Sequence, residues 1–447
     1  MVKVVHHIKG RKYLYEHYRV GDKVKCDYIG PVGDRSYATK STFAPHVSPH
    51  KIETELVFQK QLAPTFDLTK LRDMLEKVEE LELENVDMIA GELEFVLPAV
   101  SAVKRVAVER AEYRDLDFEI PLADFPGQIG EVELGATKAN GGTRKNVIKV
   151  GGEKTMPFYH FEARNPHKPV IAYDVFDTKI NLAGPVRKHF EDVLEDPAEW
   201  AKRCVKKYDA DMVTIHLIST DPAIKGTSAR EAAKTVEDIL QAVKVPIIIG
   251  GSGNPDKDPE VLEKAAEVAE GERCIINSAS MNLDYKRVAK ACLDHGHVVL
   301  SWTQLDINDQ KTLNKHLLEL GIKREDMIMD PTTAALGYGL EYSFSIMERI
   351  RLAALKGDKD LQMPISSGTT NAWGAREAWM KTPEWGDREK RGPLWEAVTA
   401  LTLCLAGSDL FMMMNPTAVQ LFEDTVESLC GFREVEPLDV KDWIGMR

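Results

Sequence analysis

The chain is poor in cysteine, and its cysteines are widely spaced. Six occur in 447 residues, and no two of them have the CxxC spacing common in metal sites. Dispersed cysteines in a long chain are typical of reduced, mostly buried thiols rather than of a disulfide framework. The same spacing argues against an iron–sulfur cluster or a structural zinc ion. We therefore expect no metal site in this chain.

The sequence also lacks long hydrophobic runs and an excess of positive charge. No segment reaches the roughly 18 apolar residues that a membrane-spanning helix needs, and the first residues, MVKVVHHIKGRKYLYEHYR, have no apolar signal-peptide core. The formal net charge is −13 and the pI is near 5.5. Such an acidic chain is poorly suited to nucleic acids and to anionic membranes. We expect a cytoplasmic protein that binds neither.

The chain does contain enough apolar residues for more than one hydrophobic core. It is 43% hydrophobic and 29% charged, and its length exceeds what a single core usually fills. We predict two domains, at residues 1–130 and 131–447. In the first, Leu93–Leu97 and Val106–Val108 resemble strands and Asp67–Glu82 resembles an amphipathic helix. This indicates a small α+β domain, in which we find no chemical motif.

Eight short apolar runs follow at regular intervals between residues 170 and 430. They are Val170–Asp177, Asp211–Ser219, Val245–Ser252, Cys274–Ala279, Val298–Thr303, Asp326–Thr332, Met363–Thr369 and Asp409–Met414. Continuous rather than alternating runs are expected for parallel strands covered on both faces. Eight strands with helices between them predict an α/β protein of the (β/α)8 TIM-barrel class. A doubly wound sheet is the less favoured alternative, because periodicity cannot prove closure.

The stretches between these runs have the pattern of helices. Ser228–Ala242 begins with a capping residue and keeps apolar residues three or four apart. The other predicted helices cover Pro259–Ala269, Leu283–Leu293, Gln310–Leu320, Ser343–Leu355 and Leu394–Ala406.

Residues 131–160 precede the barrel and contain two β-like runs around Asn140-Gly141-Gly142. This tripeptide supplies the positive φ angles that a tight hairpin turn needs. We predict a hairpin that plugs or flanks the bottom of the barrel. At the other end, residues 431–447 are expected to form a C-terminal tail.

The carboxyl ends of the predicted strands are the place to look for function, because TIM barrels carry their sites there. Most side chains at these ends are hydroxyls and amides. No strand-end histidine pairs with a carboxylate, and no lysine lies in an apolar strand as a Schiff-base lysine would. We therefore predict a binding surface without catalytic residues. Its candidate members are Ser252, Asn254, Asn277, Trp302, Gln304, Asp330, Thr332, Ser367, Thr369 and Asn371.

Four features allow two interpretations each. Gly250–Asn254 (GGSGN) resembles a phosphate-cradling loop, but a tight turn explains it more simply. Asp330 could bind the amino-imine edge of a pterin, or it could cap a helix or brace a loop. His216 fits a core or barrel-lining histidine better than a functional one. Met412–Met414 fits a core strand better than an adaptable surface under a flat cofactor.

Several stretches together resemble one family. They are LGATKANGGTR (Leu134–Arg144), KVGGEKTMPFYHFE (Lys149–Glu162), DMVTIHLISTDP (Asp211–Pro222), VPIIIGGSGNPDKDPEVLEKAAE, LSWTQLDIN, DPTTAALGYGLEYSFSIMERIRLAAL and MPISSGTTNAWGAREAW. In this order they resemble the delta subunit of the archaeal-type acetyl-CoA decarbonylase/synthase complex. That subunit corresponds to the small subunit of the corrinoid iron–sulfur protein. The resemblance covers residues 131–447, whereas residues 1–130 do not follow the family's N-terminal region.

The resemblance implies a non-catalytic subunit. It implies that a larger gamma subunit carries the iron–sulfur cluster and the corrinoid (a cobamide), and that the top of this barrel approaches the corrinoid. The pair would carry a methyl group between a tetrahydropterin and the nickel site of acetyl-CoA synthase, in a complex that also contains carbon monoxide dehydrogenase. This chain would bind no cofactor alone and share the corrinoid at the interface. The loops carrying Asn277, Gln304, Asp330 and Thr369 are expected to form that face.

Two other functions stay open. A pterin-binding methyltransferase barrel would use Asp330, Asn277 and the loop after the third strand. Against it, Asp330 is followed by Thr332-Thr333-Ala334 rather than by the glycines that let a flat ring lie against the backbone. A stand-alone sugar-phosphate enzyme is the third possibility, although no clear phosphate loop follows the last two strands.

Overall fold

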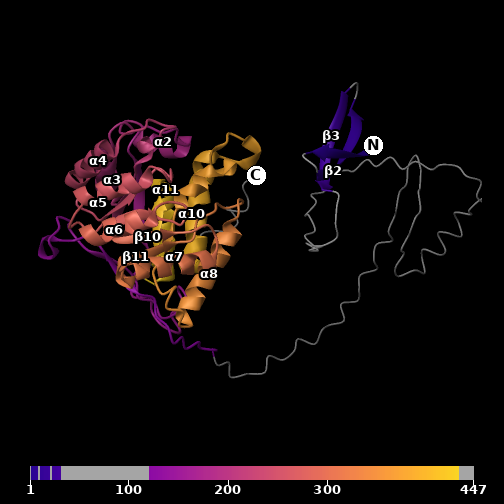
Figure 1. Ribbon diagram of the computed structural model, residues 1–447. Helices are drawn as coiled ribbons and strands as arrows, with labels where there is room; N and C mark the ends of the chain where they lie inside the picture. The colour runs from indigo at the N-terminus through magenta and orange to yellow at the C-terminus, as the bar shows by residue number, and fades with distance from the viewer. Residues whose placement is uncertain (1, 9–10, 21–22, 32–119, 432–447) are drawn as a thin grey trace, which may run out of the picture. The chain divides into compact units, whose positions relative to one another are not determined.

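The computed structural model describes residues 2–8, 11–20, 23–31 and 120–431 (Figure 1). The chain divides into two compact units, Met1–Asp117 and Phe118–Arg447. The first contains an antiparallel sheet of three strands, β1 (Val2–Ile8), β2 (Arg11–Val20) and β3 (Lys23–Pro31), with β2 in the middle. The strands predicted at Leu93–Leu97 and Val106–Val108, and the helix predicted at Asp67–Glu82, lie outside the described residues.

The second unit is built on eight parallel strands. They are β6 (Val170–Phe176), β7 (Met212–His216), β8 (Ile247–Gly250), β9 (Ile275–Ala279), β10 (Val298–Trp302), β11 (Met327–Asp330), β12 (Ser366–Ser367) and β13 (Leu410–Met413). Their order is β11-β10-β9-β8-β7-β6-β13-β12. A parallel bridge between Met329 and Ile365 joins the two ends of this order and closes the sheet. The predicted (β/α)8 barrel is therefore confirmed over the doubly wound sheet.

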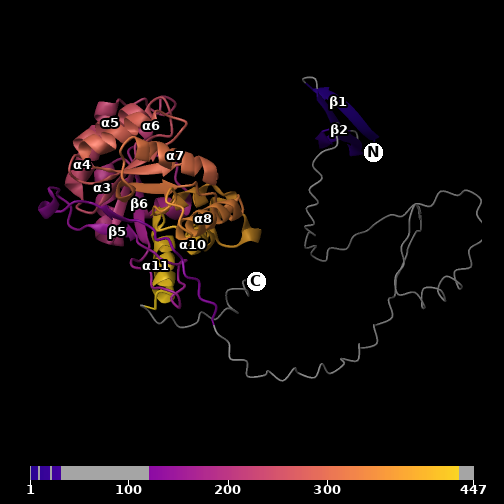
Figure 2. The same cartoon turned by 60° about the horizontal axis from the view of Figure 1, so that its bottom comes forward.

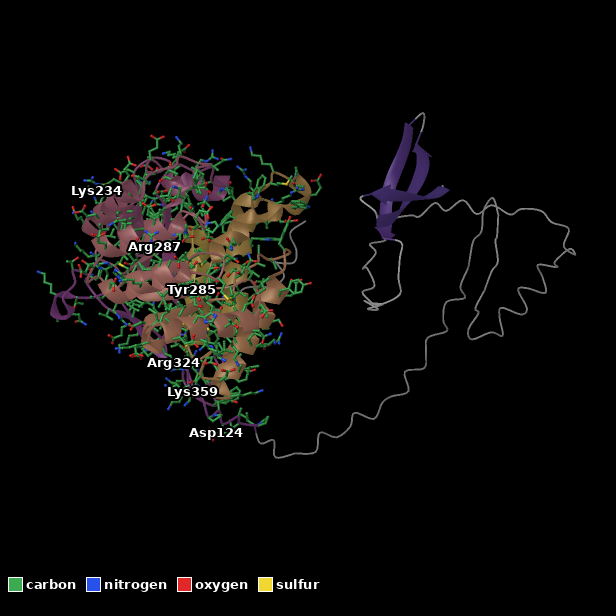
Figure 3. All side chains as sticks on the ribbon, viewed as in Figure 1. Asp124, Lys234, Tyr285, Arg287, Arg324 and Lys359 are labelled. Carbon is green, nitrogen blue, oxygen red and sulfur yellow. The ribbon has the colours of Figure 1, made fainter. Side chains whose placement is uncertain are left out.

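Helices surround the strands, as Figures 1 and 2 show. The α-helices are α2 (Gly184–Phe190), α3 (Pro197–Tyr208), α4 (Ala229–Ala242), α5 (Asp258–Val268), α6 (Tyr285–His295), α7 (Ile307–Glu319), α8 (Leu340–Leu355), α9 (Arg376–Trp379), α10 (Arg388–Ala406) and α11 (Pro416–Leu429). Short 3-10 helices cover Lys138–Asn140, Ile218–Thr220, Arg324–Asp326, Thr369–Gly374 and Pro383–Trp385. Polar side chains such as Lys234 on α4 and Arg287 on α6 cover the outside (Figure 3).

Local sequence explains where α4 begins. The Ser228 hydroxyl accepts a hydrogen bond from the Glu231 N–H, and the Glu231 carboxylate accepts one from the Ser228 N–H in return. This reciprocal pair satisfies two N–H groups that a helix start would otherwise leave unpaired. The predicted capping residue therefore has the role that the sequence indicated.

Strands β4 (Glu131–Leu134) and β5 (Ile148–Gly151) form the expected antiparallel hairpin. Val132, Leu134 and Val150 are fully buried and pack with the apolar side chains inside the barrel, so the hairpin plugs the bottom of the barrel. The expectation of a tight turn was wrong, because residues 135–147 connect the two strands. This longer loop is anchored by Arg144, whose Nε lies 2.8 Å from Glu272 Oε2 and whose Nη1 donates to the Val243 carbonyl.

Arg351 of α8 holds the closing region of the barrel together. Its side chain is 1% exposed; Nη1 donates to Glu153 Oε2 at 2.8 Å, and Nη2 donates to Asp409 Oδ2 at 2.6 Å. Asp409 Oδ2 also accepts the N–H of Ile365, next to the closing bridge. One guanidinium thus links the segment after the hairpin, an outer helix and the segment that enters β13, which in turn holds the residue before β12.

Replacing Arg351 tests this role. We expect Arg351→Ala to lower the free energy of unfolding by about 3–5 kcal/mol, because it leaves two carboxylates buried without a cation. Lys234→Ala is the control; its ion pairs with Glu237 and Asp238 are on the exposed face of α4 and should contribute little. Urea unfolding followed by circular dichroism measures both, and equal losses would contradict this account.

Candidate binding site at the mouth of the barrel

A cavity of about 640 Å³ opens at the carboxyl ends of the strands. Side chains alternate along a strand, so each last inward-facing position lies above the apolar interior. Asp174, Asn277, Trp302, Asp330 and Met412 occupy such positions, two residues beyond Ala172, Ile275, Leu300, Ile328 and Leu410 of the interior cluster. The result is a layer of mixed polar and apolar side chains on an apolar floor. Its volume is in the range of sites for small molecules, which span about 300–1,000 Å³.

Five of the candidate residues line this cavity. They are Asn277, Trp302, Gln304, Asp330 and Asn371. They come from the ends of four different strands or the loops that follow. The expectation that function lies at the carboxyl ends of the strands therefore identified residues that are far apart in the sequence but line one cavity.

The other candidates lie beside the cavity without lining it. Ser252 donates from both its N–H and its hydroxyl to Asp258 Oδ1, each at 2.8 Å, and the Gly253 N–H donates to Asp258 Oδ2. Asn254 accepts the N–H of Asp256. The N–H groups that could hold a phosphate are therefore occupied by a carboxylate of the chain itself. The geometry supports the tight-turn interpretation of GGSGN.

Thr332, Ser367 and Thr369 hold the loops rather than face the opening. The Ser367 hydroxyl lies 2.8 Å from the hydroxyls of both Thr333 and Thr369, and all three side chains are buried. Thr332 has φ of +76°, which is unusual for a β-branched residue. In this conformation its hydroxyl donates to the Thr303 carbonyl and its N–H donates to Asp330 Oδ1 at 2.9 Å. Thr332 thereby orients the carboxylate that does line the cavity.

Asp330 combines the two roles considered for it, because it braces the loop through Thr332 and also lines the cavity. The residue is 6% exposed. Burial raises the pKa of its carboxyl group to about 7, against the opposing effect of the Thr332 N–H. Near neutral pH the group can therefore either donate or accept a hydrogen bond.

His216 and Asp174 form a pair that the sequence analysis did not find. His216 Nε2 lies 3.1 Å from Asp174 Oδ1, and Asp174 Oδ2 accepts the Thr370 hydroxyl. The expectation that no strand-end histidine pairs with a carboxylate was therefore wrong. Asp174 lies inside its apolar run, and the alternation of β6 alone could have indicated that it points inward.

The environment of His216 favours its charged form. Burial, the largest single effect, lowers the pKa of the imidazole, but the Asp174 and Asp177 carboxylates together raise it by more, so the net pKa is above the ordinary value. The ring also stacks on Phe176, with centroids 4.9 Å apart. In the strand order, β7 and β11 are four strands apart, so this pair lies on the wall opposite Asp330.

The remaining ionisable groups do not add a metal or thiol site to the described residues. In that part of the chain no three His, Cys, Asp or Glu side chains are arranged to hold a metal ion. Cys204, Cys274, Cys292 and Cys404 are buried free thiols, and burial raises their pKa values. None of the described helices is long and apolar enough to cross a membrane.

We compared the sequence and the fold of this chain with those of known proteins. A model of the family "CO dehydrogenase/acetyl-CoA synthase delta subunit" matches residues 131–382. The acetyl-CoA decarbonylase/synthase complex subunit delta of Archaeoglobus fulgidus is 58% identical over 355 residues, which are 78% of this chain and 78% of that protein. Its counterpart in Methanothermobacter thermautotrophicus is 52% identical over 384 residues, covering 84% and 97%. A dihydropteroate synthase structure from Xanthomonas albilineans has a TM-score of 0.42 at 15% identity, over 60% of this chain and 94% of that one.

The raised pKa of Asp330 predicts a pH-dependent stability. The folded state holds a proton that the unfolded chain releases between its ordinary pKa of 3.8 and about 7, so ionisation in this window costs stability. Asp330→Asn keeps the acceptor for the Thr332 N–H and removes the charge. We expect it to be more stable than the unchanged chain at pH 8, by up to about 4 kcal/mol, and nearly equal at pH 4. Urea unfolding at both pH values, with Asp238→Asn as an exposed control, measures this; parallel pH profiles would refute it.

Proposed function

The chain belongs to the family of CO dehydrogenase/acetyl-CoA synthase delta subunits, and from this premise we propose that its barrel mouth docks on the corrinoid-carrying gamma subunit and covers the corrinoid. In this role the chain supports methyl transfer between a tetrahydropterin and the nickel site of the complex, without forming or breaking bonds itself.

The observation that carries this proposal is a set of exposed apolar side chains around the mouth. Tyr338 and Tyr342, after β11, are 51% and 62% exposed, and Trp379 and Trp385, after β12, are 42% and 43% exposed. Aromatic side chains are enriched in protein interfaces, and several of them around one opening are costly in water. A partner that covers the mouth would remove them from solvent.

The lining of the cavity fits the edge of a corrinoid. A corrinoid is a flat macrocycle with amide groups on its periphery, and Asn277, Gln304 and Asn371 present amides at the mouth. When bound, the corrinoid supplies the cobalt ion that carries the methyl group. The barrel's contribution would be to hold the ring's edge and to exclude water through its aromatic rim.

A second candidate function is favoured by the site around Asp330. This carboxyl group, with Asn277 on a neighbouring wall and the His216–Asp174 pair opposite, makes a polar cavity large enough for a small heterocycle. A pterin-binding methyltransferase would need such donors and acceptors. The two functions differ in what the isolated chain binds.

Co-purification tests the docking proposal. We expect the tagged chain, recovered from anaerobic native extract, to elute with a larger partner and with corrinoid and iron–sulfur absorbance. Trp379→Glu and Tyr342→Glu should each weaken the association by roughly 30-fold or more, as charges placed at interface hot spots do. Leu320→Glu is the control, because Leu320 is similarly exposed, at 38%, but follows α7 at the bottom of the barrel. A colourless, solitary protein would refute the proposal.

Titration of a tetrahydropterin into the isolated chain tests the second function. If it is correct, calorimetry should show binding that Asp330→Ala abolishes and Asp238→Ala, on the outer face of α4, leaves unchanged. Absence of binding would leave the docking function as the better account.

A further inference from the structure

A second cavity of about 380 Å³ lies outside the barrel wall, between α3 and α11. Its base is the outer face of β6, and the segments that enter β6 and β7 form one end. The functions proposed above make no use of it. Its chemistry differs from that of the mouth, because carboxylates dominate its lining.

The charges around this groove are unbalanced. The acidic members are Asp209, Asp211, Glu423 and Glu427, and the basic ones are Lys168 and Lys207. Asp211, Glu423 and Glu427 are half-buried, whereas both lysines are exposed at the edge. Within the described part of the chain, no ion pair closer than 4 Å joins any of these groups. Lys207 instead lies over the Tyr208 ring, 5.1 Å from its centroid.

An almost fully buried tyrosine at the base of the groove points to a ligand independently of the carboxylates. Tyr173 of β6 is 2% exposed and lines the groove, and its ring stacks on that of Tyr208 with centroids 6.1 Å apart. Its hydroxyl has no hydrogen-bond partner among the described residues. Burial raises its pKa, so the group remains neutral and its oxygen can accept a hydrogen bond. Because Tyr173 lines the groove, a ligand bound there can supply the hydrogen-bond partner that this hydroxyl lacks within the protein.

The carboxylate of Glu423 is held in an unfavourable environment. Burial raises its pKa, Lys168 lowers it, and the nearby Asp211 and Glu427 raise it again, to about 7. A positive charge placed in the groove would relieve this repulsion. The same repulsion between carboxylates that disfavours ionised Glu423 therefore favours the binding of a cation in the groove.

We propose that the groove between α3 and α11 binds a small linear amine with two or more ammonium groups. Its carboxylates are spread over α11 and the approach to β7, and no three of them in the described residues are arranged around one metal ion. Because the carboxylates are spread over two segments, an amine with separated ammonium groups can reach more of them than a single divalent ion can. The Tyr173 oxygen accepts one of the ammonium N–H groups.

Thermal unfolding of the full chain with spermidine tests the proposal. At pH 8, millimolar spermidine should raise Tm by about 1–2 °C, the size expected for a unit of this length when ligand exceeds its Kd several-fold. Magnesium chloride at matched ionic strength should not. At pH 6 the shift should fall by at least half, because the pKa of Glu423 is about 7 and its carboxylate takes up a proton between pH 8 and pH 6.

Two variants and a control make the test specific. Glu423→Gln should lose most of the spermidine shift, and Tyr173→Phe should fold normally but bind spermidine several-fold more weakly by calorimetry. Glu260→Gln, on the exposed face of α5, should keep the full shift. No shift with spermidine, an equal shift with magnesium, or an undiminished shift in Glu423→Gln would each overturn the proposal.

Discussion

Closure of the sheet is the constraint on which the rest of the barrel unit depends. A parallel sheet must bury both faces, and eight strands do so by joining their first and last members. Here the join lies between β11 and β12, where β12 has only two residues and one bridge links Met329 to Ile365. The buried Arg351 pairs with Asp409, which accepts the N–H of Ile365 beside this short edge. Only a closed sheet turns the last inward positions of opposite strands toward one another, so the cavity at the mouth follows from the seam.

The sequence predicted the strands well because parallel strands covered on both faces are continuous apolar runs. Helix boundaries were harder to predict. The pattern placed a helix at Leu394–Ala406, after Pro393, whereas α10 begins at Arg388 and contains that proline. Pro393 is the sixth residue of α10, so it removes one backbone hydrogen bond within the helix, and the sequence pattern mistook this interruption for the helix start. Residues 135–147 show a similar limit: Gly141 has the positive φ expected of a turn, but the loop's path depends on Arg144, which bonds to distant carbonyls.

Strand position told us where the site lies, but not which side chains remain available within it. Ser252 follows its strand as Gln304 does, yet Asp258 occupies its hydrogen-bonding groups. Asp174 was missed for the opposite reason, because it lies inside an apolar run and meets His216 only through the pairing of β6 with β7. Local sequence shows neither that Asp258 occupies the hydrogen-bonding groups of Ser252 nor that β6 pairs with β7. Both become visible only in the folded barrel, where the strands are in register.

The hairpin of β4 and β5 gives the barrel a single entrance. Because Val132, Leu134 and Val150 seal its lower end, a molecule in the cavity can exchange with solvent only through the mouth. A partner that covers the mouth therefore blocks exchange between the cavity and solvent. A guest must arrive before the cover and leave after it, and its residence time cannot be shorter than the lifetime of the covering complex. The order of assembly would thus follow from a barrel cavity that is closed at its lower end.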